Sequence, residues 1–106
     1  MILADQYIQS NDGRFRLHYQ PDGNLVLYGP GGSVLWTAGV ASVKPSEFIV
    51  QSDCNLVLYD TAGYPYWQKG TSCSGPVLRL QNDGNLVLHG GGTPFGPVVW
   101  SSGTLY

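Results

Sequence analysis

Nearly the same nine letters are written three times in this chain of 106 residues: QPDGNLVLY at 20–28, QSDCNLVLY at 51–59 and QNDGNLVLH at 81–89. The copies begin about 30 residues apart, and a spacing of this kind predicts one supersecondary unit that is used three times. A structural unit needs to keep its apolar residues and its turn, yet Gln, Asp and Asn also recur at fixed places. That polar identity indicates a role beyond folding.

Each copy is predicted to lie on a β-hairpin. Residues 15–19 alternate apolar and polar letters ahead of the first turn, which is typical of a half-buried strand. Residues 24–28 alternate in the same way directly after the turn, so the two strands are expected to pair. No stretch of the chain shows a helical period.

The turn type follows from which faces of the two strands must match. A two-residue Asp-Gly turn would place Gln20 opposite Leu25 and mix the polar face with the apolar face. A three-residue loop, 21–23, with a left-handed glycine at its end, pairs Gln20 with Asn24 instead. The apolar residues then face each other in the pairs Tyr19 with Leu25 and Leu17 with Leu27.

The other face of the hairpin carries the polar letters, with the aspartate at the tip. The third copy has glycine at the left-handed turn position, as the first has, but the second copy has Cys54 there. A left-handed residue other than glycine is uncommon. We therefore expect the middle turn to differ slightly from the other two.

Further short strands are predicted around 7–11, 34–37, 64–69 and 98–101, because these stretches are bounded by runs rich in glycine and proline. With the hairpins they predict an all-β protein.

The length suits a single domain, 1–106, built of three units at about 1–40, 41–71 and 72–106. No unit could bury its apolar face alone, so the three are expected to share a centre with pseudo-threefold symmetry. One tryptophan follows each copy, and we expect the three to fill that centre as core residues. They are Trp36, Trp67 and Trp100.

Composition excludes several classes of protein. A chain with 42% hydrophobic and 11% charged residues does not have the composition of a disordered one. The net charge is -2 and the basic residues are scattered, so we expect no nucleic-acid partner. No apolar stretch is long enough to span a membrane, and residues 1–10 do not resemble a secretory leader, which has either been removed or never existed.

Cys54 and Cys73 are the only cysteines, and in a glycine-rich chain of low charge they are predicted to form one disulfide. The alternative is a pair of reduced, buried thiols. Two cysteines are too few for a structural zinc site, which takes four ligands. A bond between them would close a loop of about 20 residues and contribute about 3 kcal/mol on the chain-entropy model.

The recurring polar residues of the three copies predict a carbohydrate site. Turn chemistry accounts for the aspartates, since their side chains bond to the local backbone. It does not account for a glutamine at three equivalent positions, or for a tyrosine on the polar face in two of them. Amides, a carboxylate and a phenol beside a small apolar patch suit a sugar, because its hydroxyls donate and accept hydrogen bonds while its ring C–H groups need a dry surface.

The three copies resemble the motif of the bulb-type, or monocot mannose-binding, lectins, Gln-x-Asp-x-Asn-x-Val-x-Tyr. The first two copies match at every specified position, and the third departs only at its last residue. The resemblance implies three mannose sites and no metal or cofactor. The site residues are Gln20, Asp22, Asn24, Val26 and Tyr28 in the first copy, Gln51, Asp53, Asn55, Val57 and Tyr59 in the second, and Gln81, Asp83, Asn85, Val87 and His89 in a weaker third.

The resemblance also implies a β-prism II fold of three four-stranded sheets with one sugar site on each. Within a site, Asp and Asn would hold the axial 2-hydroxyl of mannose, Gln the 3-hydroxyl and Tyr the 4-hydroxyl, while Val packs on the ring. Imidazole is shorter than a phenol, so His89 is not expected to reach a 4-hydroxyl from the same backbone position.

Two features depart from typical plant members of the family. Their cysteine lies in the first copy in chain order, whereas Cys54 lies in the second, although Cys73 still precedes the next copy. Plant members also exchange C-terminal strands to form dimers, and the tail after Trp100 is short, so a homodimer is an expectation of the resemblance alone. We expect a secreted or extracellular protein, with a cytoplasmic one as the alternative.

The sequence offers little for catalysis. The motif aspartates occur once per unit, unlike the paired carboxylates of a glycosidase. His18 and His89 stand alone, and no Ser/His/Asp arrangement is indicated. We therefore expect mannose and mannose-rich glycans to be bound and not cleaved. The alternative is a protein-binding or structural member of the same fold whose sugar sites are relics.

Overall fold

A computed structural model describes residues 2–104, and it consists almost entirely of short antiparallel strands. One turn of 3-10 helix, η1 (Pro30–Gly32), is the only helical element in that part of the chain. The all-β prediction is therefore confirmed. The strands are β1 (Ile2–Leu3), β2 (Tyr7–Gln9), β3 (Arg16–Tyr19), β4 (Leu25–Tyr28), β5 (Val34–Thr37), β6 (Pro45–Val50), β7 (Leu56–Asp60), β8 (Pro65–Gln68), β9 (Val77–Leu80), β10 (Leu86–His89) and β11 (Val98–Ser101).

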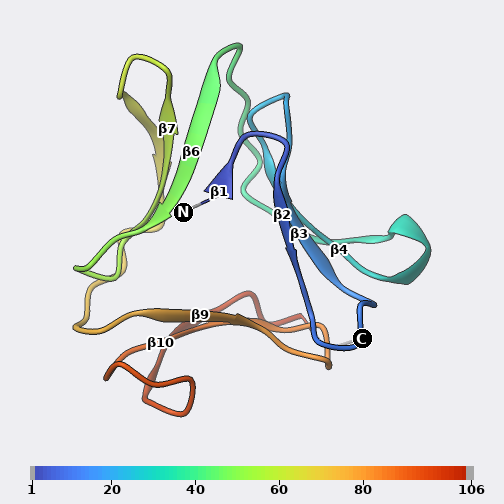
Figure 1. The fold of residues 1–106 in the computed structure, drawn as a ribbon, viewed down its shortest axis with the longest axis vertical. Coiled ribbons are helices and arrows are strands. Elements are labelled where there is room, and N and C mark those ends of the chain that lie inside the picture. Colours follow the sequence, from blue (N-terminus) through green and yellow to red (C-terminus); the bar gives the residue numbers. More distant parts are fainter. Residues whose placement is uncertain (1, 105–106) are drawn as a thin grey trace.

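The strands form three sheets, with the orders β2-β3-β4-β5, β1-β6-β7-β8 and β9-β10-β11. Figure 1 shows them as three sides around a common centre, the arrangement of a β-prism. The third sheet differs from the expected four strands, since it has three within residues 2–104. The reason lies in the N-terminal residues, which supply an outer strand to two sheets only, as β1 beside β6 and β2 beside β3.

The register of the first hairpin is as predicted. Leu17 lies opposite Leu27 and Tyr19 opposite Leu25. The N–H of Gly23 donates to the carbonyl of Gln20 at 3.0 Å, and Gly23 is left-handed with φ 88°. This three-residue loop keeps every leucine of the two strands on the inward face.

Leucine and phenylalanine side chains from the three sides fill the centre. Each motif strand contributes two buried leucines, one on either side of the motif valine. Because a single sheet has one apolar face and nothing of its own to cover it, each sheet depends on the other two. The largest fully buried side chains are Phe15, Leu17, Tyr19, Leu25, Leu27, Phe48, Leu56, Leu58, Leu86 and Leu88.

The three tryptophans gather together, but they are only partly buried. The ring of Trp36 lies edge-on to the rings of Trp67 and Trp100, with centroids 6.2 Å and 5.5 Å apart. All three pack against the buried core. They therefore contribute to the core as expected, while the innermost space belongs to leucine and phenylalanine, because so large a ring is seldom buried completely.

The middle turn does not differ as expected. Cys54 is left-handed, with φ 74°, and its N–H donates to the carbonyl of Gln51 at 2.8 Å. The same bond joins Gly23 to Gln20 in the first turn. A residue with a Cβ therefore occupies a glycine conformation, which costs about 1–2 kcal/mol.

The predicted disulfide between Cys54 and Cys73 is present, with Cα atoms 5.1 Å apart, and it accounts for the cysteine in the turn. In the first unit the backbone of Ser42 crosses the turn so closely that a Cβ on Gly23 would lie 2.3 Å from its nitrogen. In the second unit the disulfide joins the corresponding two positions. The backbone hydrogen bond of Ser42 to Asp22 is repeated by Cys73 and Asp53, and the second unit adds a covalent bond to it.

This comparison predicts how substitutions at the two cysteines change the stability of the protein. Cys54→Gly with Cys73→Ser recreates the first unit's pair, whereas Cys54→Ala with Cys73→Ala leaves a strained alanine. The alanine pair keeps the strained Cβ of the wild type and should lose about 3 kcal/mol of unfolding free energy with the disulfide, whereas the Gly/Ser pair relieves that strain and should lose about 1 kcal/mol less. Urea denaturation measures both, and an alanine pair as stable as the Gly/Ser pair would contradict the account.

Candidate functional site

The first motif copy places its five residues on the outward face of one sheet. Gln20 follows β3, Asp22 and Asn24 belong to the turn, and Val26 and Tyr28 lie on β4. The corresponding residues of the other copies lie on and before β7 and β10. The structure thus brings together the residues of each predicted site, one copy to a sheet.

A β-bulge lies at the last motif position in each sheet. The register shifts between Leu27 and Tyr28, between Leu58 and Tyr59, and between Leu88 and His89. Bulges redirect a side chain and are common beside functional sites. They could not be predicted from the motif, because the alternation of its letters is regular.

The motif aspartates hold the turns. The Oδ1 atoms of Asp22, Asp53 and Asp83 each accept a hydrogen bond, 2.9 Å long, from the backbone N–H two residues later. This is the turn chemistry expected of aspartate. Each carboxylate is also exposed, so it keeps the capacity to accept a donor from outside the protein.

The motif asparagines anchor the segment that follows the last strand of their sheet. Asn24 Oδ1 accepts from the hydroxyl of Thr37 at 3.0 Å and from the backbone N–H groups of Gly39 and Val40 at 3.0 Å and 3.3 Å. Asn85 Oδ1 accepts from the hydroxyl of Ser102 at 3.1 Å and from the backbone N–H of Thr104 at 3.3 Å. The asparagine oxygen is therefore a structural acceptor, which leaves the amide nitrogen to face a ligand.

In the first copy Gln20 links the aspartate to the tyrosine. Its amide nitrogen donates to Asp22 Oδ1 at 3.2 Å, and its oxygen accepts from the hydroxyl of Tyr28. Because Gln20 follows the strand opposite β4, this link crosses Val26, which is only 4% exposed. The valine that was expected to be an apolar patch thus lies beneath a polar network.

The second copy also pairs its glutamine with its tyrosine and its asparagine with the segment after the last strand, but its donors differ. Gln51 Nε2 donates to the hydroxyl of Tyr59, and Asn55 Oδ1 accepts from the N–H of Gly70 at 2.8 Å. In addition, Asn55 Nδ2 donates to Gln68 Oε1 at 2.7 Å. One of the two N–H donors of Asn55 is thus occupied by Gln68, so the first two sites are not equivalent.

The third copy uses its histidine differently from the tyrosines. His89 is 5% exposed, and its Nδ1 lies 3.0 Å from the carbonyl oxygen of Gly96. The ring therefore holds the loop 90–97 in place. His89 was grouped with the sugar ligands in the sequence, which stays a prediction, and the contact of its Nδ1 gives it a second role as a loop anchor.

Sequence reasoning also missed Arg79. The amide oxygen of Gln81 accepts from Arg79 Nη2 at 2.7 Å, and its nitrogen donates to Asp83 at 3.2 Å. The guanidinium thus bonds the glutamine in the third copy as the tyrosine hydroxyl does in the first. The signal was present in the sequence, since alternation along β9 puts Arg79 on the same face as Gln81.

A cavity of about 440 Å³ adjoins the first site. Its walls include the motif tyrosine, three basic side chains and a glycine-rich loop. A volume of this size is in the range that holds small ligands. The lining residues are Gly13, Arg14, Arg16, His18 and residues 28–32.

Two phenols connect the first and second sites behind their turns. Tyr66 donates to the carbonyl of Gly23 at 2.8 Å, and the hydroxyl of Tyr19 has two acceptors for its one proton, the hydroxyl of Tyr66 at 2.7 Å and the carbonyl of Tyr59 at 3.3 Å. Burial raises the pKa of both phenols above the usual 10.0. The two phenols thus link the first turn to strand β7.

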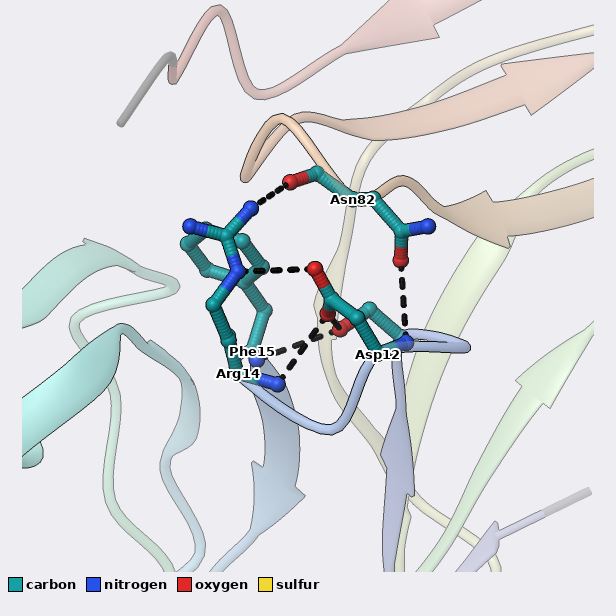
Figure 2. A network of polar contacts seen from close by, with 5 residues as sticks. Asp12, Arg14, Phe15 and Asn82 are labelled. Atoms are coloured by element: carbon teal, nitrogen blue, oxygen red, sulfur yellow. Dashed lines mark hydrogen bonds and ion pairs between the residues drawn. The ribbon is translucent and has the colours of Figure 1, made fainter.

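An ion pair fixes the third turn to the first unit (Figure 2). Arg14 Nε lies 2.7 Å from Asp12 Oδ2, and Arg14 Nη2 donates to the carbonyl of Asn82 at 2.6 Å. The N–H of Asp12 donates to Asn82 Oδ1 at 3.1 Å. Hydrogen bonds from Arg14 and then Ser10 lower the pKa of Asp12 to about 2. The turn of the third site is thus positioned by residues far away in the sequence.

Three antiparallel sheets around one core, each with a motif copy on its outward face, define a β-prism II protein. Among residues 2–104 no group of His, Cys, Asp or Glu side chains is arranged to hold a metal ion. No helix in the same range is long and apolar enough to cross a membrane.

Solved structures show the family. The chain is similar to the Japanese Marasmius oreades lectin, with 30% sequence identity and a TM-score of 0.82 over 97% of this chain and 84% of the other. It is also similar to monomeric monocot mannose-binding lectins from Gastrodia elata, with 29% sequence identity and a TM-score of 0.83 over 99% of this chain and 92% of the other. A third similar structure is a Polygonatum cyrtonema lectin complexed with monomannoside, with 30% sequence identity and a TM-score of 0.72 over 95% of this chain and 87% of the other.

No protein-family model matches the sequence, and no curated protein matches it significantly. The relationship is therefore seen through the solved structures and the motif. The chain belongs to the family of bulb-type, or monocot mannose-binding, lectins.

The ion pair of Asp12 predicts a pH-dependent stability. Because the pKa is lowered from 3.8 to about 2, the carboxylate stabilises the fold above pH 3.8, and that contribution is lost as the pH falls toward 2. Wild type should therefore be more stable than Asp12→Asn at neutral pH, and the difference should vanish near pH 2. Urea denaturation at several pH values measures it, and a difference independent of pH would exclude this role for the carboxylate.

Proposed function

We propose that this chain is a non-catalytic, multivalent lectin that binds terminal mannose through its motif copies. The observation that supports this most is that the first two copies each place Gln, Asp, Asn and Tyr on one face, with the glutamine bonded to the tyrosine and the aspartate bonded to the turn. A network anchored to the turn holds its donors and acceptors in place before a ligand arrives. That arrangement lowers the ordering cost of binding.

The hydrogen-bond partners support the roles that the family motif implies. Asn24 uses its oxygen for the backbone, so its amide nitrogen is the group left to donate to a sugar. Asp22 is exposed beside it and can accept. One axial 2-hydroxyl can accept from the amide and donate to the carboxylate at once, whereas the equatorial 2-hydroxyl of glucose points elsewhere.

The ligands of related structures point the same way. The Gastrodia elata lectins are described as mannose-binding, and the Polygonatum cyrtonema lectin is complexed with monomannoside. At the first site, the cavity beside Tyr28 offers room for a second sugar unit of a glycan.

Affinity is proposed to come from several weak sites. A single shallow sugar site binds with a dissociation constant near 1 mM, or about -4 kcal/mol. Two or three sites on one chain can raise the effective affinity for a branched glycan by roughly 10² to 10⁴. A homodimer would double the sites and stays a prediction. The last two residues of the tail, which bear on strand exchange, lie outside the described residues.

The disulfide supports a secreted or extracellular setting, because such bonds persist in oxidising compartments. There, a multivalent mannose-binding protein would crosslink glycans on cell or viral surfaces.

Sugar specificity is the direct test. Isothermal titration should show binding of methyl α-mannoside in clear preference to the glucoside and the galactoside, because only mannose presents an axial 2-hydroxyl between Asp and Asn. Equal binding of mannoside and glucoside would show that these residues do not have the proposed roles. No binding of any mannose-containing glycan on an array would favour the relic-site alternative.

The glutamines offer a second test. Gln20→Ala with Gln51→Ala removes a sugar contact and the group that orients Tyr28, without breaking a backbone hydrogen bond. We expect mannose affinity to fall roughly five- to thirtyfold, the effect of one or two lost hydrogen bonds. Gln9→Ala, on the exposed edge strand β2, is the control and should bind like wild type. A double variant that binds normally would contradict the assignment.

The third copy should bind neutral mannose most weakly, because His89 supplies no hydroxyl to the site. Asparagine knockouts would disturb the backbone, so we define a third-site variant that carries Gln20→Ala, Tyr28→Phe, Gln51→Ala and Tyr59→Phe. Its affinity for methyl α-mannoside should be roughly three- to tenfold below that of a variant keeping only the first copy, the cost of one neutral hydrogen bond. Equal affinities in isothermal titration would contradict the ranking.

A further inference from the structure

The third motif copy differs from the other two by a positive charge within its network. Arg79 on β9 lies opposite Val87 in the register. The corresponding positions hold His18 in the first copy and Ile49 in the second. Only the third copy therefore has an arginine beside the motif valine, where a bound sugar ring would lie.

Arg79 has unused bonding capacity. Its Nη2 donates to Gln81, but Nε is buried without a hydrogen-bond partner among the described residues. No carboxylate lies within ion-pair distance of the guanidinium in residues 2–104. The nearest acid of the network is Asp83, and the amide of Gln81 lies between the two charges. A buried donor without a partner is costly, so a rotation of the guanidinium toward an acceptor supplied by a ligand would be favoured.

The loop 90–97 adds an aromatic surface to the same site. Phe95 is 85% exposed, and the guanidinium carbon of Arg79 lies 5.8 Å from its ring centroid. The anchor between His89 and the carbonyl of Gly96 holds this loop beside the sheet. The copy that has histidine in place of the motif tyrosine is thus also the copy that has the cation of Arg79 and the exposed ring of Phe95.

The groove along Arg79 is open. A cavity of about 310 Å³ is lined by Asn11, Arg79, Leu80, Gln81 and Asn82. It combines the cation with amide groups and lies beside β9, an edge strand in the described part of the chain. A charged substituent on a sugar bound at Gln81 therefore has space next to the guanidinium.

We propose that the third copy is specific for a mannose-like sugar carrying an anionic group at C6, either a carboxylate or a phosphate ester, which Arg79 binds. This proposal rests on the proposed function. By family resemblance the motif tyrosine contacts the 4-hydroxyl, and Arg79 takes the tyrosine's place beside the glutamine. C6 is attached to C5, the ring neighbour of C4, so an anionic group at C6 comes within reach of the guanidinium. A planar guanidinium binds carboxylates and phosphates in a bidentate manner.

The test uses the third-site variant in isothermal titration against methyl α-mannoside, methyl α-mannosiduronate and mannose 6-phosphate. At low salt we expect at least one anionic sugar to bind about tenfold tighter than the neutral one, the effect of a charge-assisted hydrogen bond. Comparison of the carboxylate with the phosphate identifies which anion the site prefers. Adding Gln81→Ala should weaken binding of all three sugars roughly five- to thirtyfold and assigns the signal to this site.

Arg79→Gln in the same background should reduce the anionic preference to about one. Lys44→Gln, which removes an equal charge from an exposed position, is the matched control and should keep it. If no anionic sugar binds more tightly than mannoside, or if the preference survives Arg79→Gln, the proposal is wrong. If the wild type still binds methyl α-mannoside when the anionic preference is absent, the proposed function stands. The proposal for the third copy and the proposed function can therefore fail separately.

Two further readouts do not depend on how Arg79→Gln folds. The preference of the unaltered third-site variant should shrink severalfold between about 20 mM and 0.5 M salt, because the interaction is between charges. Arg79→Lys should retain part of the preference, since it keeps the charge without the planar fork. A preference insensitive to salt would overturn the proposal.

Discussion

A left-handed residue at the third position of each motif turn sets the register of the protein. The turn in the first copy has Gly23 at this position, and the second has Cys54. With a loop one residue shorter, the strand after the turn would present its leucines outward and its amides to the core. Three one-sided sheets could then not share a centre, because the rows of leucine that meet there would be lost.

The same turn also prepares the binding face. Asp22 bonds the backbone of its own turn, while Asn24 bonds the segment beyond β5, so both side chains are fixed by the hairpin itself. Gln20 then joins the aspartate to Tyr28 across a buried valine. The turn and the proposed sugar site therefore use the same polar residues, which recur at fixed positions as the leucines do. The two interpretations of these letters, turn chemistry and sugar binding, are compatible.

The sequence predicts what is local and periodic. The strands, the loop of three, the register of Leu17 with Leu27, and the disulfide all follow from alternation, turn chemistry and cysteine count, and the structure has them. What depends on the relation between segments could not be predicted. The bulges arise from an extra residue on a neighbouring strand, and Arg14 bonds Asn82 across two units. His89 was assigned from its place in the motif, and only the path of the loop 90–97 shows that it is an anchor.

The central claim is that the outward face of each motif hairpin binds mannose through groups already held in place. A residue-resolved titration of the backbone amides by nuclear magnetic resonance, with methyl α-mannoside, tests it most directly. The account predicts the largest shifts at the turns and motif strands, 20–28 and 51–59, with little change elsewhere and almost none with the glucoside. Shifts confined to another surface, or equal shifts with both sugars, would contradict it.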